Sequence, residues 1–329
     1  MAGGKSRRRK RRVGALGVLL GLLLTLGVAA LMVFGLYMVG SSRPAPESQL
    51  PAAPAVTTPV SVFRTGETVE NPAPPIAEAP AARDLQVEEF GFDEIVSDED
   101  GLFVAKILGK RYVGYIAVID DPLRLTVGRC PYFGDTAYGR SVQQMVEEHG
   151  AVLGVNGGGF SDVGGVGRGG LPTGNVIIDG QILWNGYEGT VGMDASGKLH
   201  VGNYNYTDCV NLGLQWAVSY GPTLVTDGVM TADLDTRHQE PRTALGQRED
   251  GSIVIVVLQG RQLQALGVTE RQLAEIMLGY GCVNAGNLDG GASSDIFFRG
   301  EYLNVCNTSG GPRPIPTSVL VMPPRETEG

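Results

Sequence analysis

Four short polar tracts hold the residue types that could do chemistry in this chain of 329 residues. Asn156 stands before three consecutive glycines, Asp289 stands before two, Arg242 opens a predicted strand, and Arg313 lies between two prolines. Glycines let backbone N–H groups approach a ligand, and arginines bind anions. A carboxylate can accept or donate a proton. Together the tracts predict a site that binds an anion next to a carboxylate.

Other catalytic arrangements have little support in the sequence. There are only three histidines, and no H-E-x-x-H, G-x-S-x-G or Walker A motif is present. The four cysteines show no C-x-x-C spacing, which argues against a zinc site. Four cysteines allow three full disulfide pairings; we favour Cys282–Cys306, with buried free thiols as the alternative.

The elements that must position these tracts are mainly strands. Runs rich in β-branched and aromatic residues predict strands at Val104–Leu108, Val113–Ile119, Ala151–Val155, Val176–Ile178, Ile182–Trp184, Ile253–Leu258 and Ser318–Met322. Asp179-Gly180 has the composition of a two-residue hairpin turn. Helices are predicted at Ser141–His149 and at Thr269–Leu278, the second with a capping box. We therefore expect one α+β (mixed α/β) domain with a large mixed β-sheet and a few helices.

Composition and charge limit the class of protein. Glycine accounts for 49 residues, about twice the usual ~7 %, and 43 % of the chain is hydrophobic, which excludes a wholly disordered chain. Residues 1–12 hold seven of the 26 Lys+Arg residues and no acidic residue. The remaining 19 basic residues against 35 acidic ones leave a formal charge of −16. Such an acidic body predicts no nucleic-acid partner.

The N-terminal part predicts a membrane anchor. Residues 13–40 carry no charge and are almost continuously apolar, long enough to cross a bilayer. The basic segment 1–12 then lies in the cytoplasm, and the C-terminal part is extracellular, on a single-pass protein of the cell membrane. A cleaved signal peptide is the alternative, although the apolar run exceeds a typical h-region.

The segment between the anchor and the main domain shows no pattern typical of helices or strands. Residues 41–83 are rich in proline and alanine, with nine of the 19 prolines. Such a segment predicts a semi-extended linker. The remaining residues, 84–329, have the length of one domain.

The order of the motifs N-G-G-x-F, R-T-A-x-G, N-x-D-G-G-x-S-S and R-P-x-P resembles the phosphodiester glycosidase family. The resemblance covers roughly Arg111–Met322, with Ala292 where a third glycine is common in D-G-G-G-S-S. Members of this family include the enzyme that uncovers mannose 6-phosphate by removing N-acetylglucosamine from a phosphodiester. Bacterial members are associated with exopolysaccharide biosynthesis.

The resemblance implies hydrolysis at the anomeric carbon of a sugar-1-phosphodiester, with an envelope glycan or exopolysaccharide as the expected substrate. Asp289 would stabilise an oxocarbenium-like state or activate water, and Asn156 would orient sugar or phosphate oxygens. Arg242 and Arg313 would clamp the phosphate. The further expected substrate-binding residues are Gly157, Gly158, Gly290, Gly291, Ser293, Ser294 and Thr243. Candidates for a second carboxylate are Asp295, Glu240 and Asp162.

Two other functions stay open at the level of sequence. One is a phosphodiesterase that cleaves the P–O bond, and the other is a non-catalytic module that binds envelope glycans or takes part in exopolysaccharide assembly. No cofactor is implied. The acidic loops leave Ca²⁺ open, although no EF-hand-like spacing is present.

Overall fold

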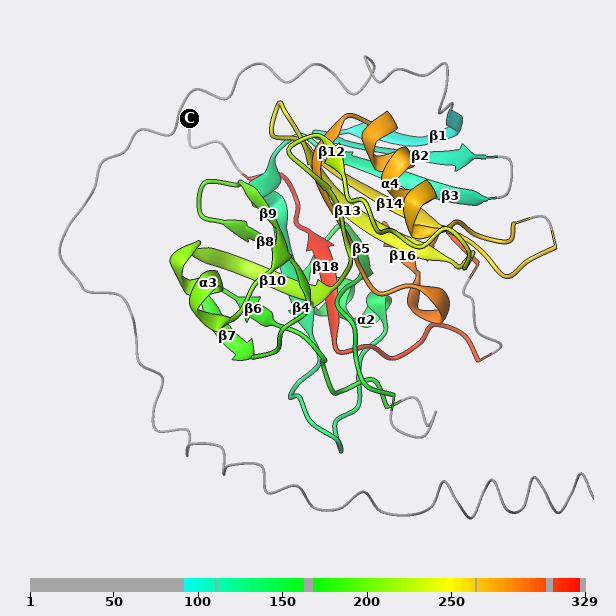
Figure 1. Cartoon of the computed structure of the whole chain (residues 1–329). Helices are drawn as coiled ribbons and strands as arrows, with labels where there is room; N and C mark the ends of the chain where they lie inside the picture. Colours follow the sequence, from blue (N-terminus) through cyan, green and yellow to red (C-terminus); the bar gives the residue numbers. More distant parts are fainter. Residues whose placement is uncertain (1–91, 110–111, 163–167, 264, 306–309, 326–329) are drawn as a thin grey trace, which may run out of the picture. The chain divides into compact units, whose positions relative to one another are not determined.

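The computed structural model describes residues 92–109, 112–162, 168–263, 265–305 and 310–325 (Figure 1). The chain divides into two units, Met1–Glu70 and Asn71–Gly329, and every described residue belongs to the second. The predicted basic segment 1–12, transmembrane helix 13–40 and linker 41–83 all lie outside the described residues. Within the described ranges, no helix combines the length and the apolar character that crossing a bilayer requires.

The described strands form three antiparallel sheets. The largest has eight strands in the order β1-β2-β3-β14-β13-β15-β11-β12. Their bounds are β1 Phe92–Glu99, β2 Leu102–Leu108, β3 Val113–Ile119, β11 Thr223–Thr226, β12 Val229–Met230, β13 Arg242–Arg248, β14 Ile253–Leu258 and β15 Cys282–Asn287.

The other two sheets have five strands each, in the orders β7-β6-β10-β8-β9 and β17-β16-β5-β18-β4. The first comprises β6 Val176–Ile178, β7 Gln181–Trp184, β8 Gly189–Asp194, β9 Leu199–Asn203 and β10 Leu214–Tyr220. The second comprises β4 Leu125–Arg129, β5 Leu153–Asn156, β16 Ile296–Phe298, β17 Glu301–Tyr302 and β18 Thr317–Val321.

The expected single large mixed sheet is therefore wrong, because every pairing between described strands is antiparallel. Antiparallel neighbours can be joined by tight turns, whereas parallel neighbours need long crossovers. The hairpin between β6 and β7 shows the favoured connection. Its two turn residues, Asp179 and Gly180, both have positive φ, at 52° and 70°, as a type I′ turn requires. The predicted turn is confirmed.

Both predicted helices are confirmed, together with the residues that start them. Helix α2 spans Val142–His149 with Ser141 as its N-cap, and α4 spans Glu270–Gly279. The hydroxyl of Thr269 accepts from the Gln272 N–H, and the Gln272 side chain accepts from the Thr269 N–H, so the capping box is complete. The short helix α3 covers Tyr206–Asn211, and 3₁₀ turns cover Pro122–Arg124 (η2) and Gly291–Ser293 (η4).

All three sheets share one large hydrophobic cluster. The eight-stranded sheet contributes Ile255, β10 contributes Val218, β5 contributes Val155 and β18 contributes Val319, all fully buried. Burial of this apolar surface is the main term that fixes the sheets relative to one another. It thereby fixes the loops at their strand ends.

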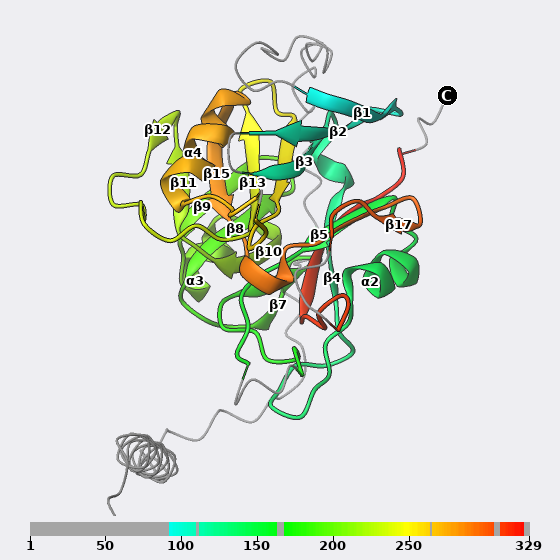
Figure 2. The same cartoon turned by 90° about the vertical axis from the view of Figure 1, so that its right-hand side faces the viewer.

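The two longer helices cover outer sheet faces (Figure 2). Helix α4 buries Leu273, Ile276 and Met277 in the cluster on the second face of the eight-stranded sheet. Helix α2 buries Val142, Met145 and Val146 against the sheet that contains β5 and β18.

The described cysteines are buried free thiols, namely Cys130, Cys209 and Cys282. The favoured Cys282–Cys306 pairing is therefore wrong for Cys282, while Cys306 itself lies outside the described residues. Cys282 belongs to β15, where it packs in the apolar cluster under α4. In that place it acts as a small hydrophobic residue.

Candidate active site

The four polar tracts meet where two of the sheets adjoin. Strand β5 ends at Asn156 beside the start of β18, and β15 ends at Asn287 beside the start of β13. Antiparallel pairing places the end of one strand next to the beginning of its neighbour. Each of the two sheets therefore presents two of the four tracts at the adjoining ends of neighbouring strands.

Backbone hydrogen bonds join the tracts to one another. The N–H of Asp289 donates to the carbonyl of Gly157 over 3.1 Å, and the N–H of Gly157 donates to the carbonyl of Thr317 over 3.0 Å. On the other side, the N–H of Leu288 donates to the carbonyl of Thr243 over 2.9 Å. The loop that carries Asp289 is thus held from both sheets.

Asn156 and Thr243 lie beneath this loop, and both are fully buried. The Asn156 side chain accepts from the Thr243 hydroxyl over 2.7 Å and donates to the Asp289 carbonyl over 2.5 Å. Their side-chain polar groups are therefore occupied within the fold. In this structure they hold the Asp289 loop in place, and the direct substrate contact that the sequence predicts for them stays a prediction.

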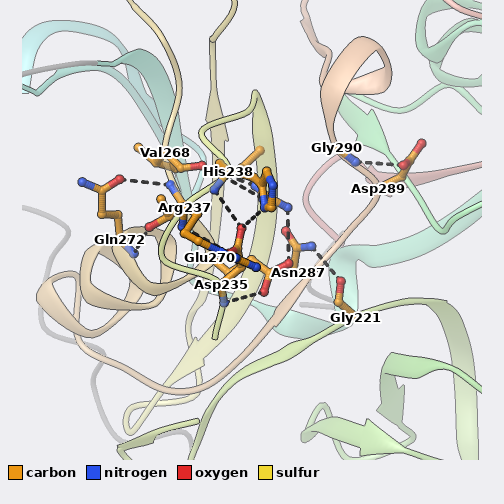
Figure 3. Close-up of polar contacts among 12 residues, drawn as sticks. Gly221, Asp235, Arg237, His238, Val268, Glu270, Gln272, Asn287, Asp289 and Gly290 are labelled. Carbon is orange, nitrogen blue, oxygen red and sulfur yellow. Dashed lines mark hydrogen bonds and ion pairs between the residues drawn. The ribbon is translucent and has the colours of Figure 1, made fainter. Parts of the chain in front are cut away.

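The Asp289 carboxylate is partly buried at the centre of the site. Burial raises the pKa of Asp289 to about 6. Hydrogen bonds from Ser293 and from the N–H of Gly290, and the positive charge of Arg313, oppose this shift and favour the ionised form. Figure 3 shows the Gly290 N–H directed at the carboxylate, over 2.9 Å. The carboxylate can therefore change protonation state near neutral pH.

Arg313 lies on one side of Asp289. Its guanidinium donates to the hydroxyl of Ser293 over 3.3 Å and to the carboxylate of Asp162 over 2.6 Å, and it covers the ring of Phe160 at 4.6 Å. Because Ser293 also bonds Asp289, a continuous polar chain runs from Asp162 to Asp289. The ring and the carboxylate hold the guanidinium in one orientation.

Arg242 is the second arginine of the site and is only 7 % exposed. Its contacts are long: 3.4 Å to the carbonyls of Val268 and His238, and 3.6 Å to the carboxylate of Glu270. Figure 3 shows this neighbourhood, in which Glu270 also accepts from the backbone N–H of Asp235. A buried guanidinium with such weak contacts keeps donor capacity for an anion.

The four predicted anion-binding glycines have their N–H groups occupied. Gly157 and Gly158 donate to Thr317, Gly290 donates to Asp289, and Gly291 donates to Pro241. These N–H groups therefore donate within the protein in this structure, and their contact with a phosphate stays a prediction.

The glycines are instead required by close packing of the backbone. A Cβ atom at Gly157 would lie 2.5 Å from the hydroxyl oxygen of Thr317, and one at Gly158 would lie 2.7 Å from the carbonyl oxygen of Ser219. Real Cβ atoms do not approach so closely. Glycine thus lets the Asn156 tract fit between β18 and β10.

The remaining predicted residues divide by exposure. Ser293, Ser294 and Asp295 are at most 1 % exposed, so a substrate reaches none of them without movement. Glu240 faces solvent and pairs with Arg261 over 2.7 Å. Among the candidate second carboxylates, Asp162 is connected to the Asp289 carboxylate through Arg313 and Ser293.

A cavity of about 350 Å³ lies next to Asp162. Its described lining includes Gly134, Ala137, Ser161, Arg168 and Leu171. The ranges that the structure covers contain no group of three or more His, Cys, Asp or Glu residues arranged to hold a metal ion.

Tyr220 was not among the predicted site residues, although the charges of Asp289 and Arg242 act on the pKa of its hydroxyl. It is the last residue of β10 and is followed by Gly221-Pro222. The same signal that marked the four tracts, a polar residue at a strand end before glycine, could have identified it.

Comparison with known proteins gives a family match over the part of the chain that holds the site. Residues 149–322 match the model of a family described as phosphodiester glycosidase, and this range contains all four tracts. A curated relative from Bacillus subtilis (strain 168), the SPbeta prophage-derived uncharacterized protein YomE, is 33 % identical over 190 residues. That match covers 53 % of this chain and only 28 % of the relative's length.

Solved structures share the fold at low sequence identity. The catalytic domain of zebrafish N-acetylglucosamine-1-phosphodiester alpha-N-acetylglucosaminidase, auto-inhibited by its pro-peptide, has a TM-score of 0.56 at 22 % identity. The match covers 71 % of this chain and 87 % of the zebrafish chain. A hypothetical protein from Synechocystis has a TM-score of 0.55 at 13 % identity, with 69 % of this chain and 63 % of that one covered.

Proposed function

Since the chain belongs to the phosphodiester glycosidase family, a family of hydrolases, we propose that it hydrolyses the glycosidic bond of a sugar-1-phosphodiester. One observation carries the proposal. The Asp289 carboxylate, whose pKa is raised to about 6, lies where four tracts converge, with Arg313 and Arg242 nearby.

The proposed chemistry places charge where these side chains can stabilise it. Water attacks the anomeric carbon and gives a proton to the ionised Asp289 carboxylate. As the bond to water forms, the glycosidic C–O bond between the anomeric carbon and the phosphate oxygen breaks, and its electron pair leaves with the phosphate. A phosphate is a weak base, so its departure needs less help from a general acid than departure of an alcohol does. The oxocarbenium-like transition state is cationic, and the adjacent carboxylate stabilises it.

The two arginines have separate parts in this mechanism. Arg242, buried with long contacts, clamps the phosphodiester. Arg313 holds Ser293 and Asp162 and lowers the pKa of Asp289, so that more of this carboxylate is ionised at neutral pH. Asn156 and Thr243 fix the loop from below.

Isotope labelling tests the reaction directly. The chain is incubated in ¹⁸O-labelled water with UDP-sugars and a panel of synthetic sugar-1-phosphodiesters, and both products are analysed by mass spectrometry. Label in the released sugar supports C–O cleavage. Label in the phosphate indicates a phosphodiesterase, and saturable glycan binding without release from any substrate indicates a binding module.

We further propose that the substrate is an envelope glycan or exopolysaccharide and that the domain acts outside the cell. The uncharged run at residues 13–40 and the basic residues before it support a single-pass anchor with a cytoplasmic N-terminus. Fractionation of cells that express the full chain, followed by external protease treatment, tests this. Recovery in the membrane fraction with a protected domain would contradict the orientation.

A further inference from the structure

Tyr220 projects beside the tract that begins at Asn156. It ends β10 and is 40 % exposed, and a Cβ atom placed at Gly159 would lie 2.5 Å from its Cδ2 atom. The backbone is joined at the same point, because the N–H of Gly159 donates to the carbonyl of Ser219 over 2.8 Å. One edge of the ring is therefore seated against the glycine tract.

The residues after Tyr220 are joined to the Asp289 loop. The Asn287 side chain donates to the carbonyl of Gly221 over 2.7 Å, a contact visible in Figure 3, and the N–H of Gly221 donates to the carbonyl of Asn287 over 3.3 Å. Asn287 is itself fully buried. Tyr220 is thus fixed between the two loops that form the proposed site.

The surroundings keep the Tyr220 hydroxyl protonated. Burial raises the pKa of Tyr220, and the negative charges of Asp289, Glu270 and Glu188 add to this effect, while Arg242 opposes it. The hydroxyl makes no hydrogen bond to any residue that the structure describes. A partly exposed phenol close to a carboxylate and a guanidinium is therefore an unused donor.

We infer that Tyr220 is a substrate-contacting residue, whose hydroxyl donates a hydrogen bond to a phosphodiester oxygen beside Asp289 and whose ring forms one wall of the sugar site. The inference rests on the proposed function. A phosphodiester offers acceptor oxygens only, so it matches a phenol donor next to Arg242. Aromatic rings supply rigid contact area for a ligand.

The test compares Tyr220→Phe, which removes only the hydroxyl, with Tyr220→Leu, which removes the ring. The control is Tyr206→Phe, at the exposed start of α3. For the panel member that the wild type cleaves best, we expect kcat/KM to fall about 10-fold or more in Tyr220→Phe, as loss of one hydrogen bond to a charged group predicts. The fall should be smaller for a neutral aryl glycoside of the same sugar, and Tyr220→Leu should reduce activity on both.

Binding measurements separate this inference from the proposed function. Calorimetry with the phosphonate analogues of the panel gives Kd values without turnover. If the wild type binds but does not cleave, and Tyr220→Phe binds more weakly, the proposed reaction fails and the contact stands. If the wild type cleaves and Tyr220→Phe is unaltered in both kcat/KM and Kd, the contact is overturned. A wild type that neither binds nor cleaves overturns both.

Discussion

The N–H of Asp289 donates to the carbonyl of Gly157 over 3.1 Å, and this bond joins the two sheets at the centre of the site. Gly157 in turn donates to Thr317, so three distant tracts share one run of backbone hydrogen bonds. The position of the carboxylate therefore depends on backbone geometry as much as on its own side-chain contacts. The following predictions test this arrangement.

Replacing Asp289 by Asn should lower kcat by about 10²–10⁴-fold, the usual effect of losing a general base. The Asn side chain can still accept the hydrogen bonds from Gly290 and Ser293, so the fold should persist. Steady-state kinetics and a thermal melt measure the two effects. Asp227→Asn, in an exposed turn, is the matched control and should leave kcat unchanged. Near-wild-type turnover by folded Asp289→Asn would remove Asp289 from the mechanism.

The raised pKa of Asp289 predicts how stability changes with pH. The folded pKa of about 6 exceeds the unfolded value of ~3.9, so the native state holds the proton more tightly. The raised pKa of Asp289 contributes to the free energy of unfolding. This contribution is fully present below about pH 4 and is lost as pH rises through about 6. The loss is on the order of 2–3 kcal/mol. Urea unfolding at pH 4 and pH 7.5 should show this loss in the wild type but not in Asp289→Asn. Equal pH dependence in both proteins would contradict the assignment.

Replacing Arg313 by Gln should shift the activity profile to higher pH. The positive charge of Arg313 lowers the pKa of Asp289, so its removal raises that pKa and delays ionisation. The ascending limb of kcat/KM against pH, expected near pH 6 in the wild type, should move upward.

Arg299 provides a close control for this change. It also covers a phenylalanine, Phe298 at 5.1 Å, and pairs with an acid, Glu99 at 2.9 Å. Arg299→Gln should leave the pH profile in place. If both variants shift the pH profile equally, the shift comes from the change in net charge of the protein and not from the contact of Arg313 with the site.

Replacing Thr243 by Val should act through Asn156. The variant removes the buried hydroxyl that donates to the Asn156 side chain over 2.7 Å, at an expected cost of about 1–3 kcal/mol in the free energy of unfolding. Because the same amide holds the Asp289 carbonyl, kcat should fall while KM changes little. Thr226→Val, at the exposed end of β11, should change neither the free energy of unfolding nor kcat. A rise in KM alone would indicate direct substrate contact by Thr243.

Replacing Gly157 by Ala should destabilise the protein by about 1–3 kcal/mol and lower activity, as overpacking does in a close-packed site. The new Cβ atom would lie 2.5 Å from the Thr317 hydroxyl oxygen and 2.7 Å from the Thr317 carbonyl oxygen, so the backbone must shift. Gly310→Ala is the control, because a Cβ atom there meets nothing within 4 Å. The free energy of unfolding measured with denaturant should be lower for Gly157→Ala than for Gly310→Ala. Equal stability would show that the site tolerates the shift.

Local features of the fold could be predicted from the sequence because short-range chemistry decides them. The capping box at Thr269 and the turn at Asp179-Gly180 each depend on a few adjacent residues, and both were predicted correctly. The mixed sheet was predicted wrongly, because strand runs reveal their own extent but not the direction of their partners. Likewise, spacing alone could not show that Cys282 packs as a free thiol under α4.

The sequence by itself determined which tracts we predict to carry the chemistry, since Asn156, Arg242, Asp289 and Arg313 are distinguished by residue type and by flanking glycine or proline. Only the tertiary structure decided how these residues are placed and what they contact. Burial and hydrogen bonding depend on neighbours far away in the chain: they turn Asn156 inward, occupy the glycine N–H groups and raise the pKa of Asp289. The same long-range packing brings Tyr220, a strand-end residue that was not among the predicted site residues, to the edge of the site.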